Sequence, residues 1–410
     1  MLEINLHMYH AVALGAIMFW VGRQLTSRIA ILDKFCIPAP LVGGLIFAIL
    51  NAILYTANIA IVSFDDTFGT LFNTMFFTSV GFSASVPALL KGSKAVFIVL
   101  AGTVVMICLQ NGLGGAIMSL LGEDSLYGIA CGSLSLIGGP GTSAGIGPDL
   151  EAAGAAGATE IALASAVFGM TCGSLIGGPL ARLLVIRHKL ETPFSREHRS
   201  TLSEEEQMTI QKAEADSDED GKYVTDGPSF LKAFLLMMLA IGVGDILSVL
   251  LTNLFNISFP SYIGGMALGV IIRNVMEFSH QKFPVKEMDN LGNSALNIFL
   301  SMAVCGMELW QLVDLAGPMI LTLLAQIVLI FLVSYFALFR ALGGDYDAAV
   351  TTAGFLGMGL GTASNAMVSM QAVSNKYGVS KSAYFAVPVA GIFMDFCNAA
   401  LIAVNINLWS

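Results

Sequence analysis

Two glycine-rich segments contain the residues of this sequence that could bind a small anion. The first is LSLIGGPGTSAGIGPDLEAAGAAGA, residues 134–158, and the second is TTAGFLGMGLGTASNAMVSMQAVSN, residues 351–375. Glycine lets the backbone approach a solute closely and adopt a positive φ. A helix that begins after such a turn offers free N–H groups and the positive end of its dipole to a carboxylate. The segments therefore predict a pair of binding turns lined by backbone.

Hydroxyl and amide side chains at the centre of each segment would add polar ligands without adding charge. Thr142 and Ser143 follow the glycines of the first turn, and Thr362, Ser364 and Asn365 follow those of the second. We predict that ten residues of the two turns contact the substrate. They are Gly138, Gly139, Gly141, Thr142, Ser143, Gly359, Gly361, Thr362, Ser364 and Asn365.

A carboxylate and an amide lie together in the last apolar stretch, GIFMDFCNAALI. Asp395 and Asn398 are three residues apart, which places them on the same side of a helix. An ionisable group inside a membrane usually marks an ion or substrate path, so a cation ligand is one interpretation and a buried structural carboxylate is the other. Carbonyl groups released where a helix breaks also coordinate Na⁺. The predicted Na⁺ ligands are Ser135, Thr142, Gly361, Thr362, Asp395 and Asn398.

Other chemistries have no support in the sequence. A proton relay through histidine is disfavoured because all five histidines lie near the first residue or in predicted loops. The chain has no GxxxxGK[ST] phosphate loop, no paired cysteine spacing and no nucleophile with a base inside its apolar stretches. The sequence therefore predicts neither an enzyme nor a bound cofactor, and an ion gradient would have to supply the energy for transport. The histidines are His7, His10, His188, His198 and His280.

Some small and polar residues inside apolar stretches have more ordinary explanations. Gly169, Gly173 and Gly177 recur every four residues, which is typical of close packing between membrane helices. Gln110 and Asn111 could line a solute path or could bridge neighbouring helices, and the sequence does not separate these two interpretations.

The elements that must position the binding turns are membrane helices. Hydrophobic residues make up 56% of the 410 positions and charged residues only 12%, against roughly 25% in soluble domains, and the mean hydropathy is +0.78. A bilayer-spanning helix needs about 20 mostly apolar residues, and such stretches recur along the chain. We predict ten spans. They lie near residues 8–22, 38–57, 67–87, 94–120, 159–186, 230–253, 260–275, 289–310, 316–340 and 381–406.

An acidic interval divides the chain into two halves. Residues 1–190 form the first half with a hairpin near 125–158, and residues 230–410 form the second with a hairpin near 345–378. Residues 191–229 between them include the runs EEE and DED and few apolar residues, which is the composition of a flexible linker. We expect this linker to be a passive tether.

The two halves are predicted to be inverted copies of each other. Gly43-Gly44 and Gly264-Gly265 are 221 positions apart, and other glycine landmarks keep nearly the same offset. Lys and Arg gather in alternate short loops, which places both termini outside and the linker in the cytoplasm. The predicted fold is an all-α polytopic membrane protein with two inverted-topology repeats, each of about five transmembrane helices plus one re-entrant hairpin. Backbone opened at the hairpin tips inside a membrane requires a cavity or protein groups around it.

The chain resembles the bacterial sodium/glutamate symporters. The matching stretches are PAPLVGGL, FFTSVGFSASVPALLKG, LSLIGGPGTSAG, ATEIALASAVFGMTCGSLIGGPLARLL, DYDAAVTTAGFLGMGLGTASNAMVSMQAV and VPVAGIFMDFCNAALI. Together they span nearly the whole chain outside the linker. At one position the pattern differs, because Pro140 stands at the first turn where a polar residue is expected, and proline has no N–H to donate.

This resemblance implies Na⁺-coupled uptake of L-glutamate across the bacterial cytoplasmic (inner) membrane by alternating access. It also implies an elevator-type movement of a core domain against a scaffold, and a homodimer formed through the helices outside the hairpins. Na⁺ would be the coupling ion. The alternatives are a cation- or proton-coupled carrier or exchanger of another small carboxylate and, in a different class, an ion channel, since paired re-entrant loops also build selectivity filters.

Overall fold

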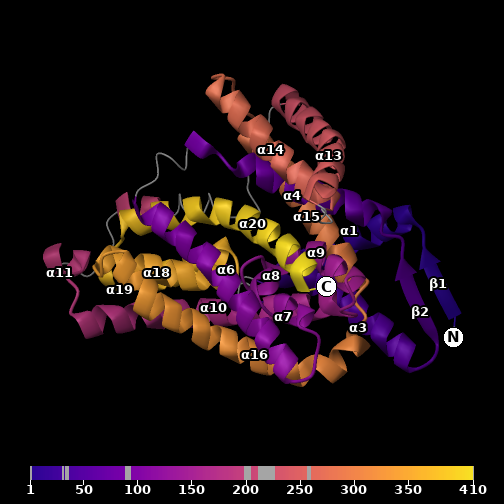
Figure 1. The fold of residues 1–410 in the computed structure, drawn as a ribbon, viewed down its shortest axis with the longest axis horizontal. Helices are drawn as coiled ribbons and strands as arrows, with labels where there is room; N and C mark the ends of the chain where they lie inside the picture. Colours follow the sequence, from indigo (N-terminus) through magenta and orange to yellow (C-terminus); the bar gives the residue numbers. More distant parts are fainter. Residues whose placement is uncertain are drawn as a thin grey trace.

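The computed structural model of the chain is mostly helical (Figure 1). It describes residues 2–29, 32, 37–87, 94–197, 205–210, 227–255 and 260–409. Each of the ten predicted spans is a helix. The first half contains α1 (Met8–Thr26), α3 (Ala39–Thr56), α4 (Thr67–Ser83), α6 (Lys94–Leu120), α7 (Leu126–Ala130), α8 (Ser133–Leu136), α9 (Gly139–Ala152) and α10 (Ala158–His188).

The second half also consists mainly of helices. Its helices are α13 (Gly227–Phe255), α14 (Ser261–Phe278), α15 (Val285–Cys305), α16 (Leu312–Leu332), α18 (Tyr346–Gly359), α19 (Ala363–Tyr377) and α20 (Lys381–Trp409). A short 3-10 turn, Leu309–Gln311, precedes α16, and a π-helical segment, Val333–Leu338, joins α16 to α17 (Phe339–Ala341). Among the described residues, six helices are long and apolar enough to cross a membrane, so the chain is an integral membrane protein. They cover Ala39–Thr56, Lys94–Leu120, Ala158–His188, Gly227–Leu254, Leu315–Ala341 and Lys381–Trp409.

The helices form two bodies, and each half of the chain contributes to both. We call α1, α3, α4, α13, α14 and α15 the scaffold body, because these helices pack mainly on one another. The hairpin body contains α6 to α10 and α16 to α20. In it α10 lies beside α18 and α19, while α13 and α14 of the scaffold body project together on another side of the molecule (Figure 1).

Glycines allow closely matching helix contacts in the two halves of the scaffold body. A Cβ atom at Gly43 of α3 would lie 1.8 Å from the carbonyl oxygen of Met18 in α1. A Cβ atom at Gly264 of α14 would lie 1.9 Å from the carbonyl oxygen of Gly244 in α13. No side chain fits at either crossing, so the helix backbones touch directly.

Two short strands correct the all-α prediction. β1 (Leu2–Leu6) pairs in parallel with β2 (Ala60–Phe64), with Leu2 opposite Ala60. The helices α1 and α3 provide the long connection that a parallel pair requires. Hydropathy did not reveal the strands because they are only five residues long and lie beside much longer apolar helices.

The glycine-rich first hairpin is more helical than its composition suggests. Gly141, Gly145, Gly147 and Pro148 lie inside α9, although glycine and proline both disfavour the interior of a helix. Each glycine lies where a neighbouring helix approaches: a Cβ at Gly145 would lie 2.4 Å from Asn73 Oδ1, for example. Packing therefore outweighs the low intrinsic helix propensity of glycine, and only the tip is open.

The described part of the linker contacts the hairpin body. Helix α11 (Pro193–Glu197) and a helical turn at residues 205–210 belong to this part. Glu205 pairs with Lys381 Nζ at 2.6 Å, and Ile210 is only 4% exposed. This segment is therefore more than the expected tether. The rest of the predicted linker, residues 198–204 and 211–226, lies outside the described residues.

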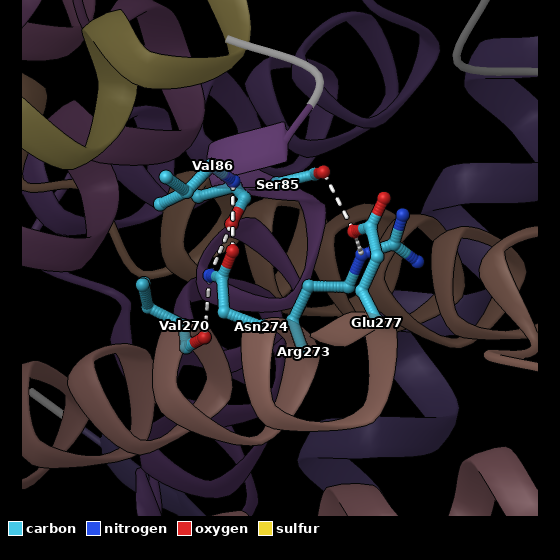
Figure 2. A network of polar contacts seen from close by, with 7 residues as sticks. Ser85, Val86, Val270, Arg273, Asn274 and Glu277 are labelled. Atoms are coloured by element: carbon cyan, nitrogen blue, oxygen red, sulfur yellow. Dashed lines mark hydrogen bonds and ion pairs between the residues drawn. The ribbon is translucent and has the colours of Figure 1, made fainter. Parts of the chain in front are cut away.

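A polar network fixes the end of α4 to α14 (Figure 2). The helix ends at Ser83, and the Val86 N–H then donates to Asn274 Oδ1 at 2.7 Å. Asn274 Nδ2 donates in turn to the carbonyl of Ala84 at 3.0 Å, so one amide satisfies both sides of the unwound backbone. Beside it, the Ser85 hydroxyl donates to Glu277, whose carboxylate also pairs with Arg273 Nε at 3.3 Å (Figure 2).

Candidate functional site

A cavity of about 440 Å³ lies between the scaffold body and the two hairpin tips. This volume suits a small solute rather than a macromolecule. The scaffold body contributes Pro38, Pro40, Phe76, Leu296, Asn297 and Leu300. The hairpin body contributes Ile137, Gly138, Pro140, Gly141, Thr142, Thr362, Ala363, Pro388, Val389, Gly391, Ile392, Met394 and Asp395.

The first tip directs a helix N-terminus towards this cavity. Helix α8 ends at Leu136 and α9 begins at Gly139, whose φ of +67° is one that glycine adopts without strain. The first amides of a helix have no partner within it, so those of α9 can donate to a solute. Thr142, in the first turn of α9, adds a hydroxyl to the lining of the cavity. Pro140 also lines the cavity, and its ring takes the place of one donor.

The second tip places another helix N-terminus on the same cavity. Helix α18 ends at Gly359, Thr362 is extended, and α19 begins at Ala363. Thr362 and Ala363 both line the cavity. A Cβ atom at Gly139 would lie 3.1 Å from Thr362 Cγ2, so the two tips meet directly.

Asn365 fixes the second tip without lining the cavity. Its Oδ1 accepts a hydrogen bond from the Thr362 N–H at 3.1 Å, which forms half of a capping box. Its Nδ2 donates to the carbonyl of Met170 and to Ser174 Oγ, both at 2.7 Å and both in α10. Asn365 is fully buried, and in this arrangement it positions the tip on α10.

Asp395 is the one ionisable residue among the described residues that line the cavity. It lies on α20. The site therefore combines one carboxylate, two positive dipole ends and the hydroxyls of Thr142 and Thr362. Such a set can hold a cation at the carboxylate and an anion at the backbone amides.

Several residues predicted as ligands do not line the cavity. The Ser143 hydroxyl donates to the Gly139 carbonyl at 2.8 Å, and the Ser135 hydroxyl to the Gly132 carbonyl at 3.3 Å. Gly361 lies against the Asn365 side chain. The backbone of Ser364 belongs to the first turn of α19, and its side chain is outside the described atoms.

The side-chain amides of Asn398, Asn111 and Gln110 are buried and bond to the backbone of the two hairpins. Asn398 Nδ2 donates to the carbonyl of Ser133 at 3.0 Å, and Asn111 Oδ1 accepts from the N–H of the same serine. Gln110 Nε2 donates to the carbonyl of Gly359 at 3.1 Å. Gln110 and Asn111 thus bridge helices in this structure, as one of the two interpretations expects.

The glycines of α10 pack against the second hairpin, as their spacing predicts. A Cβ at Gly169 would lie 2.6 Å from the Leu360 carbonyl oxygen, and one at Gly177 would lie 2.3 Å from Ser369 Oγ. This close contact brings α10 to within hydrogen-bond distance of Asn365, so it holds the second tip in place.

The scaffold side of the cavity was missed at the sequence level. Asn297 is its one polar side chain among the described lining residues, and it lies between Leu296 and Leu300 on α15. An amide in an apolar helix is a weak signal for a site. Asn73 was also missed: its Nδ2 donates to the carbonyl of Gly145 at 3.0 Å and so ties α4 to α9.

The fold and the cavity define the class of protein: an integral membrane protein whose two helical bodies both line a solute-sized cavity. A family model described as sodium/glutamate symporter matches residues 4–379. The chain belongs to this family. Because the family consists of symporters, the prediction that the chain is not an enzyme is confirmed.

Curated relatives match along nearly their entire length. The sodium/glutamate symporter of Haemophilus influenzae is 35% identical over 402 residues, which cover 97% of this chain and 96% of the relative. That of Escherichia coli is 34% identical over 393 residues, which cover 95% and 94%. Among solved structures, a sodium proton antiporter from Methanocaldococcus jannaschii aligns over 97% of both chains with 14% identity and a TM-score of 0.42.

Proposed function

We propose that this chain takes up L-glutamate across the cytoplasmic (inner) membrane of a bacterium in symport with Na⁺. The observation that carries the proposal is a cavity lined by two helix N-termini and by the carboxylate of Asp395. Glutamate has two carboxylates, and each can accept hydrogen bonds from the amides of one helix N-terminus. The names of the full-length relatives support the same substrate and ion.

Sodium would bind at Asp395 and prepare the cavity for the anion. The predicted ligands are the Asp395 carboxylate, the Thr142 and Thr362 hydroxyls and carbonyls released at the tips. Without a cation, Asp395 repels an anionic substrate by about 3 kcal/mol at roughly 5 Å, for an effective dielectric constant of about 20. Neutralising this charge would raise glutamate affinity roughly a hundred-fold, which couples the two solutes.

The proposed architecture is an inverted repeat. Its support is the offset of equivalent contacts: Gly43 and Gly264 differ by 264 − 43 = 221 positions, and their helix crossings are closely alike. Each half also has the same order of elements around its hairpin. With an odd number of spans in each half, the second half has the opposite orientation. Both termini would then lie outside and the linker in the cytoplasm.

Alternating access would follow from movement of the hairpin body against the scaffold body. This elevator-type movement is supported by the position of the cavity, which is lined from both bodies. A rigid scaffold body would remain in place, and we propose that it forms the contact of a homodimer. Such a contact leaves the hairpin body free to move.

Uptake into proteoliposomes tests the function. The purified chain should accumulate labelled L-glutamate under an imposed Na⁺ gradient and should not do so under equal K⁺ or proton gradients. Empty liposomes are the control. Accumulation without Na⁺ would contradict the symport mechanism, and a proton-coupled carrier would respond to the proton gradient instead.

A substrate panel in the same vesicles tests the assignment of glutamate. Pro140 removes one backbone donor from the first tip, so a different small carboxylate is the main alternative substrate. Unlabelled L-glutamate should compete with the label more effectively than aspartate or dicarboxylates without an amino group. Currents far above carrier turnover in a planar bilayer would favour the channel alternative.

A further inference from the structure

A groove on the side of the hairpin body lies outside the proposed transport site. It is formed by α10 and α19, which run parallel and in register. Along this pair the Ser369 hydroxyl donates to the Gly173 carbonyl at 3.2 Å, and a Cβ at Gly178 would lie 3.2 Å from Ala372 Cβ. The groove has a volume of about 510 Å³ and lies towards the C-terminal ends of both helices.

The walls of this groove are apolar. Pro179 and Leu183 come from α10, and Val373 comes from α19. Leu183 is 42% exposed and Ile186, on the same wall, is 60% exposed, although both lie on a helix long and apolar enough to cross a membrane. An acyl chain of the surrounding bilayer can cover such side chains through van der Waals packing.

Two basic residues complete the groove. Arg182 of α10 and Lys376 of α19 both line it, and both are exposed. No carboxylate is among the described residues of the lining. The described partner of Lys376 is a neutral ring, with Nζ 5.6 Å from the Tyr377 centroid. Two cations on one apolar groove are complementary to a phosphate that carries hydrocarbon chains.

We propose that this groove binds one anionic phospholipid of the surrounding bilayer. Its phosphate lies between Arg182 and Lys376, and one acyl chain lies along Leu183 and Ile186. Helix α19 leads from this groove to the second tip, where it begins at Ala363, about 20 Å away along the helix. The lipid therefore steadies the helix pair that holds the tip. The proposal requires only that the chain is embedded in a membrane, so it stands or falls independently of Na⁺ and glutamate.

Lipid binding to the purified full-length protein tests this site. Native mass spectrometry in detergent should detect one tightly bound phosphatidylglycerol, and phosphatidylcholine should bind far more weakly. The double variant Arg182→Gln/Lys376→Gln should bind phosphatidylglycerol about thirty-fold more weakly, as expected for the loss of two basic contacts. The double variant Arg182→Lys/Lys376→Arg keeps both charges and should retain binding.

Arg187→Gln is the matched control, because Arg187 is exposed on the same helix and does not line the groove. This variant should bind phosphatidylglycerol as the wild type does. An equal loss of phosphatidylglycerol binding in this control would mean that binding depends only on the overall charge of the protein. The proposed site would then be wrong. Unchanged binding in the Gln/Gln variant would also overturn the proposal. Inorganic phosphate should not displace the lipid, since the apolar walls contribute to binding.

Discussion

At the scale of single residues, Asp395 has the most direct predicted role. Because it is the one ionisable residue among the described lining of the cavity, replacing it with a neutral isostere should remove most of the attraction for Na⁺. In Asp395→Asn we expect the Na⁺ concentration for half-maximal uptake to rise at least roughly ten-fold, equivalent to about 1.4 kcal/mol. Glutamate uptake measured over a series of Na⁺ concentrations gives this value.

Asp347→Asn is the control for this substitution. Asp347 is exposed in the first turn of α18, at the opposite end of that helix from the tip. The control should keep the Na⁺ dependence of the wild type. Unchanged Na⁺ activation in Asp395→Asn would exclude Asp395 from the ion site.

Asn365 carries a second prediction, because its amide joins the second tip to α10. Asn365→Ala removes the capping box and leaves buried groups of Thr362 and α10 without this partner. We expect a loss of about 1–3 kcal/mol in stability, together with a marked fall in uptake. Thermal unfolding in detergent and proteoliposome uptake measure the two effects.

Asn375→Ala tests whether this effect is specific. Asn375 is exposed on the same helix, so this substitution should change neither the unfolding temperature nor the uptake appreciably. Equal behaviour of the two variants would mean that the capping box does not hold the tip.

Some of the site could be predicted from residue types, and some could not. Thr142, Thr362 and Asp395, which were predicted as ligands, line the cavity. Asn398 was placed on the same helical side as Asp395, yet it is fully buried and bonded to Ser133. Three residues turn a helix by about 300°, so the two side chains diverge by about 60°, and the packing around α20 decides which of them reaches the cavity.

At the scale of elements, the amide of Asn274 replaces the helical hydrogen bonds that α4 loses where it ends (Figure 2). Asn274→Ala leaves the Val86 N–H and the Ala84 carbonyl without this partner, which should cost about 2–3 kcal/mol in stability. Hydrogen exchange of residues 84–87 should accelerate. Asn253→Ala, at an exposed position of α13, should leave this exchange unchanged. Equal exchange in both variants would contradict the role of Asn274.

The positions of the helices could be predicted from hydropathy, because each span needs a long apolar stretch. The positions of the two tips could be predicted from glycine and proline content, but the extent of the helices around the tips could not. In α9 the glycines fit against α4, α10 and α15, and this fit depends on helices distant in sequence. The strand pair β1 and β2 was missed for a similar reason, since its partners are 58 positions apart, from Leu2 to Ala60.

At the scale of the whole molecule, the contact between α4 and α9 should change if the hairpin body moves. A Cβ at Gly145 would lie 3.2 Å from Asn73 Cγ, so cysteines at both positions can form a disulfide with modest adjustment. In a background without the six native cysteines, oxidation of Asn73→Cys/Gly145→Cys should abolish uptake and a reductant should restore it. The two single variants control for the substitutions themselves.

A disulfide within the hairpin body is the matched control. The Cβ positions of Gly178 and Ala372 are 3.2 Å apart, and both residues lie in that body. Oxidation of Gly178→Cys/Ala372→Cys should leave uptake close to that of its reduced form. Full uptake by the oxidised Asn73→Cys/Gly145→Cys protein would exclude relative movement of the two bodies at this contact.

Asp395, the one carboxylate among the described residues that line the cavity, also has an electrical consequence. With Asp395 ionised, one glutamate anion and two Na⁺ would leave the occupied cavity neutral, whereas the empty cavity carries one negative charge. Moving one elementary charge across the whole membrane changes its energy by about 2.3 kcal/mol for each 100 mV of membrane potential. In the proposed elevator-type movement, the outward return of the empty hairpin body would move negative charge out of the cell. An inside-negative voltage would accelerate that return and leave the loaded step almost unaffected.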